Sequence, residues 1–196
     1  YTDASLHEAL DLFRQATELD PNYALAWAGM ADAYGQLCQW GKSADIAELT
    51  PLGLAAARRA ISLNPRLPEA HKAEALNLGF MGDREGSRTS LLRAIEANPR
   101  FTPALLNLTV DAYQRADVAG AERYCRRALE ADPQEAFATM WLTQLTGMTR
   151  REEEAIACTH RIRQFASSPF YLTLLYTLRA WIQMARGDLA AAAEAM

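Results

Sequence analysis

Residues 20–34 read Asp20-Pro21-Asn22-Tyr23-Ala24-Leu25-Ala26-Trp27-Ala28-Gly29-Met30-Ala31-Asp32-Ala33-Tyr34, and this stretch decides the fold. Its opening step, an acidic or amide residue followed by proline, recurs at Asn64-Pro65, Asn98-Pro99 and Asp132-Pro133. The four prolines are separated by 44, 34 and 34 residues, and each introduces a similar apolar helical pattern. A period of 34 residues with a polar-proline step between helices predicts a solenoid of helix–turn–helix units.

The repeating unit resembles the tetratricopeptide repeat (TPR) family. Ala26-Trp27 opens its first helix, and Met30, Ala31 and Tyr34 fill the next signature positions of that family. The family pairs each first helix, helix A, with an antiparallel second helix, helix B. The resemblance therefore implies an all-α fold: a right-handed superhelical α-solenoid of antiparallel helix pairs, with about eleven helices.

The proline steps divide the chain into repeats of one continuous solenoid over residues 1–196. We expect a partial repeat at 1–21, repeats at 22–65, 66–99, 100–133 and 134–168, and a second partial repeat at 169–196. A helix is predicted at 3–19, with the spacing of small residues typical of helix B. Its helix A would lie upstream, so we expect the chain to be a piece of a longer protein.

The first complete repeat is ten residues longer than the period, and we place this insertion at 35–52. Gly41-Lys42-Ser43 predicts a break after helix A, and Thr50 before Pro51 predicts an N-cap and the first turn of helix B. The insertion is either a tolerated surface loop or a binding loop, because insertions in repeat proteins often fall on one face.

Residues 6–75 carry a narrower resemblance to TPR regions of bacterial signalling proteins. The match runs through residues 22–34, Pro51, residues 55–60, Asn64-Pro65 and residues 69–71. In that class the TPR region follows a winged-helix DNA-binding domain, a nucleotide-cyclase domain or a protein-kinase domain. The resemblance implies a cytoplasmic region of a signalling or transcriptional regulatory protein.

Composition limits the partners of the chain. The net charge is −4 and the isoelectric point is about 5.4, which argues against nucleic acid as the main ligand. Arginines at 58–59, 123, 126–127, 161 and 163 fall mostly on B helices, where we expect a solvated surface. Three cysteines without CxxC spacing favour reduced thiols. The apolar run at 170–178 is too short to span a membrane.

The sequence predicts no catalytic or cofactor site. His7, His71 and His160 lie in three different repeats and are not paired at metal-ligand spacing. Cys38 has no obvious activating base, so we expect an inert thiol. No glycine-rich phosphate loop or nucleophile motif is present. We therefore expect no enzyme, no cofactor and no metal.

The family's register places the A helices on the concave face, where TPR proteins bind partners. Only Lys72 and Asn107 could serve in the carboxylate clamp of chaperone-binding TPRs, so we do not expect that clamp. An apolar, Met-rich groove suits a peptide, an amphipathic helix or a flanking domain of the same protein. The predicted groove residues are Gln36, Lys72, Leu76, Leu106, Val110, Tyr113, Phe137, Met140 and Gln144.

Two functions follow as alternatives. The first is a non-catalytic protein-interaction or regulatory module that binds its partner in this groove. The second is a structural spacer or oligomerisation arm that stacks end to end, because solenoids need terminal units with a polar outer face. Neither end of this chain shows such a unit, so Leu6, Leu10 and Phe13 at the first helix are expected to be partly exposed.

Overall fold

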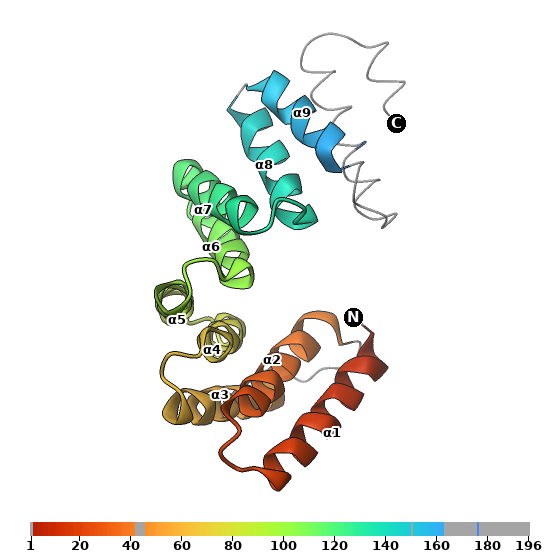
Figure 1. Ribbon diagram of the computed structural model, residues 1–196, viewed down its shortest axis with the longest axis vertical. Coiled ribbons are helices and arrows are strands. Elements are labelled where there is room, and N and C mark those ends of the chain that lie inside the picture. Colours follow the sequence, from red (N-terminus) through yellow and green to blue (C-terminus); the bar gives the residue numbers. More distant parts are fainter. Residues whose placement is uncertain (1, 42–45, 150, 163–175, 177–196) are drawn as a thin grey trace. The chain divides into compact units, whose positions relative to one another are not determined.

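The computed structural model describes residues 2–41, 46–149, 151–162 and 176, and these residues are helical without any strand (Figure 1). They form nine helices rather than the eleven predicted; the two further helices were expected beyond residue 168, outside the described residues apart from Tyr176. The right-handed superhelix stays a prediction. The helices are α1 (Asp3–Leu19), α2 (Ala24–Trp40), α3 (Ile46–Leu63), α4 (Pro68–Phe80), α5 (Arg84–Ala97), α6 (Thr102–Gln114), α7 (Val118–Ala131), α8 (Ala136–Met148) and α9 (Glu152–Ile162).

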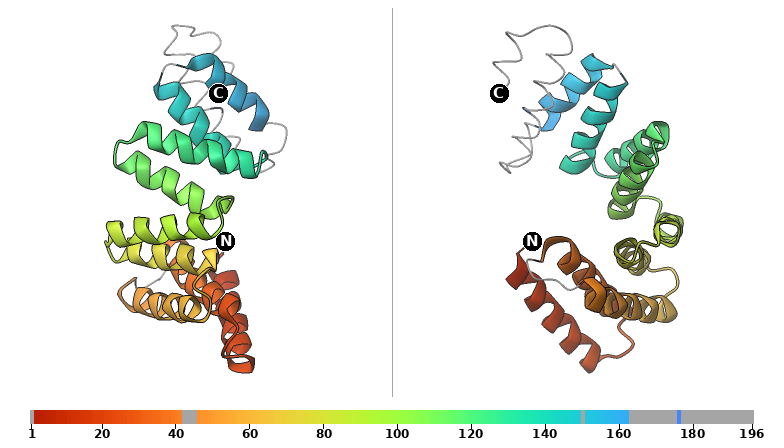
Figure 2. Two further views of the ribbon diagram at one scale, coloured as in Figure 1. Left: turned by 60° about the vertical axis from the view of Figure 1, so that its left-hand side comes forward. Right: turned by 180° about the vertical axis from the view of Figure 1, so that it is seen from behind.

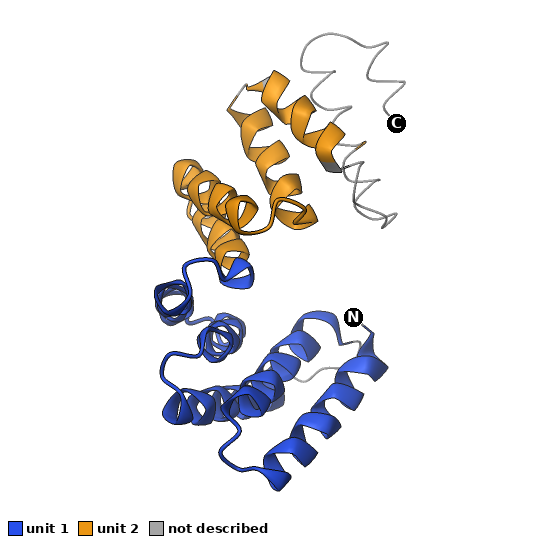
Figure 3. Ribbon diagram, in the orientation of Figure 1, with its two compact units in different colours: residues 1–104 blue, residues 105–196 orange. Residues whose placement is uncertain are grey.

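The chain divides into two compact units, residues 1–104 and residues 105–196 (Figure 3). Unit 1 contains α1 to α5 and the first turn of α6, and unit 2 contains the rest of α6 and α7 to α9. The single continuous solenoid over 1–196 and the repeat boundaries stay predictions.

The polar-proline steps owe their recurrence to one local hydrogen bond. The side-chain oxygen of Asp20 accepts from the backbone N–H of Asn22, two residues on, at 2.9 Å. The same bond is made by Asn64, Asn98 and Asp132, at 3.1, 3.0 and 3.0 Å. An Asx turn of this kind needs a short polar side chain, and the following proline cannot continue the preceding helix. The step therefore ends each B helix and sets the start of the next A helix.

Trp27 and His71 are each the sixth residue after the proline of a polar-proline step. The indole Nε1–H of Trp27 donates to the carbonyl oxygen of Pro21 at 3.0 Å. The Nε2 of His71 lies 2.8 Å from the carbonyl oxygen of Pro65. Because a carbonyl can only accept, this nitrogen carries the proton. His71 is buried, so it is a packing residue that reproduces the bond of the tryptophan.

The core of unit 1 forms where α1 packs on α2, and α2 on α3 and α4. In each view of Figure 2, α2 and α3 run side by side. Leu6 and Leu10 of α1 are only 4% and 3% exposed, because they pack against α2. The expectation that they are partly exposed at the chain end is therefore wrong, and the exposed leucines of α1 are Leu12 and Leu19.

The B helix of the first complete repeat begins earlier than the sequence indicates. We expected Thr50 to cap a helix starting at Pro51, but α3 starts at Ile46 and contains Pro51 in its interior. Thr50 is buried, and its hydroxyl donates to the carbonyl oxygen of Ile46 at 2.7 Å. Much of the predicted insertion is therefore helix: it completes the end of α2 and lengthens the start of α3.

In unit 2, α8 packs between α7 and α9. Thr139, Thr143 and Thr146 of α8 are fully buried. Each hydroxyl donates to the carbonyl oxygen four residues earlier, at 2.9, 2.9 and 2.7 Å. These bonds satisfy the hydroxyls inside their own helix, so α8 presents methyl groups to its neighbours.

The A–B turns of two successive repeats share one design, 34 residues apart. Asp83 and Asp117 cap α5 and α7 by accepting from the N–H of Gly86 and Gly120, at 2.9 and 2.8 Å. The residue before each cap has a positive φ, 84° at Gly82 and 59° at Ala116. Glycine adopts this conformation without steric cost, whereas alanine does not.

Candidate functional site

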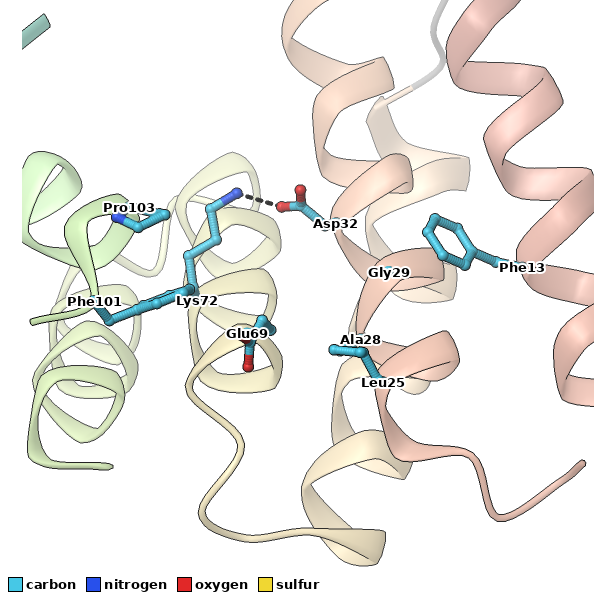
Figure 4. Close-up of a pocket in the computed structure, with 9 residues that line it drawn as sticks. All are labelled: Phe13, Leu25, Ala28, Gly29, Asp32, Glu69, Lys72, Phe101 and Pro103. Carbon is cyan, nitrogen blue, oxygen red and sulfur yellow. Dashed lines mark hydrogen bonds and ion pairs between the residues drawn. The ribbon is translucent and has the colours of Figure 1, made fainter. Parts of the chain in front are cut away.

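An open cavity of about 420 Å³ lies on the A-helix side of unit 1 (Figure 4). It is bounded by α1, α2, α4 and the segment that leads into α6. Most of its walls are apolar, and its three charged side chains come from α2 and α4. The lining residues are Phe13, Leu25, Ala28, Gly29, Asp32, Glu69, Lys72, Phe101 and Pro103.

The floor of this pocket depends on Gly29 of α2. The ring of Phe13, from α1, lies against this glycine: a Cβ added at position 29 would meet the ring at 2.4 Å. Phe13 is half-buried and also packs on the core of unit 1. A side chain at position 29 would displace the ring, so the small residue shapes this wall.

Two charged residues of the pocket form an ion pair between helices. The Nζ of Lys72 on α4 donates to the Oδ1 of Asp32 on α2. The Lys72 side chain is 13% exposed and that of Asp32 is 33% exposed, so the pair is shielded from water more than most surface ion pairs. Lys72 was predicted from the sequence as a groove residue, and it lies in the pocket wall.

Glu69 is the third charged residue of the pocket. It lies in the first turn of α4, after Pro68, and its Oε2 is buried without a hydrogen-bond partner among the described residues. Burying a carboxylate oxygen without a donor is unfavourable. Glu69 is therefore the one charged residue of the pocket that no ion pair with another lining residue compensates.

The other groove residues predicted in unit 1 do not line the pocket. Gln36 is buried, and its Oε1 accepts from the indole N–H of Trp40 at 3.1 Å. Leu76 packs against Gly35 of α2, where an added Cβ would meet its Cδ2 at 2.6 Å. Leu76 therefore packs α4 against α2, whereas the hydrogen bond of Gln36 lies within α2.

The predicted residues of unit 2 gather around Trp141, which the sequence analysis did not single out. The Tyr113 ring on α6 meets the Trp141 ring edge-on, with centroids 4.9 Å apart. Phe137 approaches Trp141 at 6.1 Å, and the amide of Gln144 donates to the Tyr113 hydroxyl at 3.3 Å. Trp141 follows Met140 in the chain, and Met140 is the one of these two neighbours that the family register predicts in the groove.

The three other groove residues predicted in unit 2 lie on α6 and α8. Met140 is 7% exposed and belongs to the interior, so it is not offered to a partner. Leu106 and Val110 are half-buried on α6. The ring contacts of this unit are those of Trp141 with Tyr113 of α6 and with Phe137 of its own helix.

Four charged side chains join α7 to α9 and the turn before it. Glu122 accepts from Arg151 at 2.8 Å and from Arg126 at 2.8 Å. Arg126 also donates to Glu154 at 2.5 Å. The hydrogen bond from Arg151 is the main cause that lowers the pKa of Glu122 from 4.5 to about 2; burial opposes it, and Arg126 reinforces it. Arg126 was expected on a solvated surface; its side chain is 42% exposed and also links α7 to α9.

The cysteines have no feature that would activate a thiolate. Burial is the main cause that raises the pKa of Cys125 to about 12, and its Sγ–H donates to the carbonyl oxygen of Ala138 at 2.9 Å. Burial likewise raises the pKa of Cys38 and of Cys158. Within the described residues, no group of His, Cys, Asp and Glu side chains could hold a metal ion.

A second cavity, of about 440 Å³, lies on the B-helix side of unit 1. It is more polar than the first, and Arg66, Arg93 and Glu96 are its charged lining residues. The remaining lining residues are Ile61, Pro65, His71 and Ala97. Its lining therefore carries both signs of charge, unlike the mostly apolar walls of the first cavity.

Comparison with known proteins identifies the fold. No family model and no curated protein matches the chain. Among solved structures, Pseudomonas aeruginosa pilF is similar with a TM-score of 0.75 at 18% identity, over 98% of this chain and 82% of that one. YrrB, described as a TPR protein with an unusual peptide-binding site, gives 0.67 at 14%, over 95% and 90%. A thermophilic TPR protein of Thermus thermophilus gives 0.68 at 19%, over 92% and 90%. The chain therefore has the helical fold of TPR proteins.

Of the helices that the structure describes, none combines the length and the apolar character that crossing a membrane requires.

Proposed function

We propose that the chain is a non-catalytic protein-interaction module whose A helices bind a segment of a partner protein. The observation that carries this proposal is the pocket of unit 1, an open apolar cavity of about 420 Å³ on the face formed by α2 and α4. Mostly apolar concave sites with a few polar groups are the usual form of ligand sites. A peptide or helix would place an apolar side chain there.

The chemistry of the side chains supports binding rather than catalysis. Lys72 is tied to Asp32, and burial holds the three thiols protonated by raising their pKa. A nucleophile needs a neighbouring base or a lowered pKa. The pocket instead offers surface and one unpartnered carboxylate oxygen, which are features of a recognition site.

The cellular setting that we propose is a bacterial signalling or transcriptional regulatory protein in the cytoplasm. It rests on the resemblance of residues 6–75 to TPR regions of such proteins. The partner is then either another protein or a domain of the same protein. The peptide-binding site named for the structurally similar YrrB is in keeping with a peptide ligand.

The proposal is tested by selecting dodecapeptides from a random phage-displayed library against the chain. The Kd of the most enriched peptide is then measured by fluorescence anisotropy for the wild type and for Leu25→Glu. Leu25 is 44% exposed at the pocket, so a charge there is expected to weaken binding at least tenfold while the circular dichroism spectrum stays unchanged.

Leu92→Glu is the matched control, because Leu92 is 38% exposed on α5 and does not line the pocket. Its Kd should equal that of the wild type. A library that yields no binder, or peptides that bind Leu25→Glu as well as the wild type, would overturn the proposal.

Self-association through α1 is a second candidate function. Leu12 and Leu19 on this helix are 59% and 89% exposed, and exposed apolar side chains favour association. Light scattering over a range of concentrations tests it: the wild type should form dimers that Leu12→Glu with Leu19→Glu abolishes. A wild type that is monomeric at all concentrations excludes this candidate.

A further inference from the structure

We propose that the pocket of unit 1 selects a partner segment in which a lysine or arginine stands next to an apolar anchor residue. This inference rests on the proposed function and gives the chemistry of its ligand. It follows from the charges in the pocket, from the pairing of two of them and from the third, which has no partner.

The charge balance of the pocket favours a cationic ligand. Among the nine lining residues, Asp32 and Glu69 are anionic and Lys72 is the one cation. The ion pair between α4 and α2 cancels Lys72 against Asp32 (Figure 4). The carboxylate of Glu69 is left as the uncompensated charge of an otherwise apolar cavity.

Glu69 has one explanation that requires no ligand. It lies in the first turn of α4, where a negative charge is favoured by the partial positive charge of the helix start. That interaction acts on the charge as a whole, however, and supplies no hydrogen bond to Oε2, which is buried and unpartnered. A cationic group of a segment bound in the pocket would compensate the charge of the Glu69 carboxylate, which no residue of the pocket does.

The position of Glu69 indicates where a basic residue would stand relative to the apolar anchor residue of the ligand. It lines the pocket from α4, while Leu25 and Ala28 line it from α2 and Phe101 from the segment before α6. An apolar side chain that contacts Leu25 and Phe101 therefore brings its neighbouring residue within the same cavity as the Glu69 carboxylate. A lysine or arginine at that neighbouring position provides several N–H donors and the opposite charge.

An acidic segment or a free C-terminal carboxylate fits this pocket poorly. It would need Lys72 to leave Asp32, and it would bring a further negative charge beside Glu69. Charges of like sign across an interface are unfavourable, and they determine specificity as much as attractive pairs do.

The test compares the peptides that the random dodecapeptide library yields with the wild type and with Glu69→Gln. With the wild type, the enriched peptides are expected to carry lysine or arginine within two positions of a large apolar residue. Replacing this cation by glutamine in the best peptide should weaken binding about tenfold to the wild type and leave binding to Glu69→Gln unchanged. Glu8→Gln, at an exposed glutamate of α1 outside the pocket, is the control and should behave as the wild type.

The variant Lys72→Gln distinguishes a basic ligand from an acidic one. Because it releases Asp32, a basic peptide should bind this variant as tightly as the wild type or more tightly. A ligand held by Lys72 would instead lose most of its affinity. Circular dichroism of each variant establishes that the helices are retained.

Three results would overturn the inference while leaving the proposed function intact: acidic peptides enriched by the wild type, apolar peptides enriched without charge, or the same basic preference with Glu69→Gln. Self-association that Glu69→Gln abolishes would replace the partner by a second copy and would also overturn it. A library that yields no binder removes both proposals.

Discussion

The two units pack their helices by opposite means. In unit 1, glycines bring side chains of neighbouring helices close: Phe13 lies on Gly29, Leu76 on Gly35 and Asn77 on Gly53. In unit 2, the corresponding space is filled by the rings of Tyr113, Phe137 and Trp141. Unit 1 keeps an open pocket, whereas the aromatic cluster of unit 2 is largely satisfied by its own contacts.

The polar interactions differ in the same way. Unit 1 places one ion pair, Lys72 with Asp32, within its pocket. Unit 2 uses the network around Glu122 to attach α9 to α7. Small residues and a charge beside an apolar surface suit the binding of another molecule, while filled volume and cross-linked charges suit stability. The difference teaches that one repeated backbone can be specialised for either role by few side chains.

The largest expected effect comes from breaking the glycine packing of unit 1 with Gly53→Ala. The added Cβ would lie 2.1 Å from the Oδ1 of Asn77, which is fully buried. The Nδ2 of Asn77 donates to the carbonyl oxygens of Ala31 and Ala73, both at 2.9 Å, so its side chain cannot withdraw freely. We expect the free energy of unfolding to fall by about 3 kcal/mol, measured by urea denaturation.

Gly79→Ala is the matched control for this change. Gly79 lies in α4, and a Cβ there would meet only the Oγ of Ser87, at 3.7 Å. We expect the free energy of unfolding to stay unchanged or to rise by about 0.5 kcal/mol, because alanine favours helix over glycine. Equal effects of the two changes would contradict the role of Gly53 as a contact site.

A smaller effect is expected when the aromatic cluster of unit 2 is emptied by Trp141→Ala. Trp141 is half-buried between Tyr113 and Phe137, so the change should lower the free energy of unfolding by about 2 kcal/mol. The Nε1 of Trp141 is buried without a partner among the described residues. Trp141→Phe, which removes this donor and keeps a ring, should therefore cost less than about 1 kcal/mol. A phenylalanine variant as unstable as the alanine variant would show that the rings do not stabilise unit 2.

The smallest of these effects is expected for Glu122→Gln, which weakens the ion network of unit 2. Because its arginine partners are about two-fifths exposed, water screens the pair, and the loss should be about 1 kcal/mol at pH 7. The pKa of Glu122 in the fold, about 2, lies below the ordinary 4.5. Its stabilising contribution is therefore present above about pH 4.5 and is lost as the pH falls towards 2.

Thermal denaturation of the wild type and of Glu122→Gln at about pH 7 and about pH 2.5 measures this dependence. The difference in melting temperature should be clear at the higher pH and should shrink at the lower one. Glu18→Gln, at an exposed position of α1, controls for the loss of one charge. A difference that is the same at both pH values would contradict the role of the ionised carboxylate.

Much of the fold could be predicted because its signals are local. The Asx turn lies within three residues, so each polar-proline step identifies the end of one helix and the start of the next. The same local reading failed at Thr50, because a threonine before proline resembles a helix start whereas α3 already begins at Ile46. Inside α3 the Thr50 side chain is buried, and its hydroxyl donates to the carbonyl oxygen of Ile46 and does not cap a helix start.

Only the part of the candidate site that lies on the A helices could be predicted from the sequence. The register of the A helices places Lys72 on the face that lines the pocket. Phe13 and Phe101 come from α1 and from the segment before α6, and no pattern within an A helix points to them. In α8 the family register points to Met140, which is buried, whereas the ring contacts with Tyr113 and Phe137 are made by its neighbour Trp141.

Ala116 shows which part of the A–B turn is essential to its geometry. Its left-handed backbone costs a residue with a side chain about 1 kcal/mol, whereas Gly82 holds the equivalent turn 34 residues earlier without that cost. Both turns keep the aspartate that caps the next helix. The two turns therefore share the capping aspartate and differ at the residue before it, so the same cap forms whether that position holds glycine or alanine.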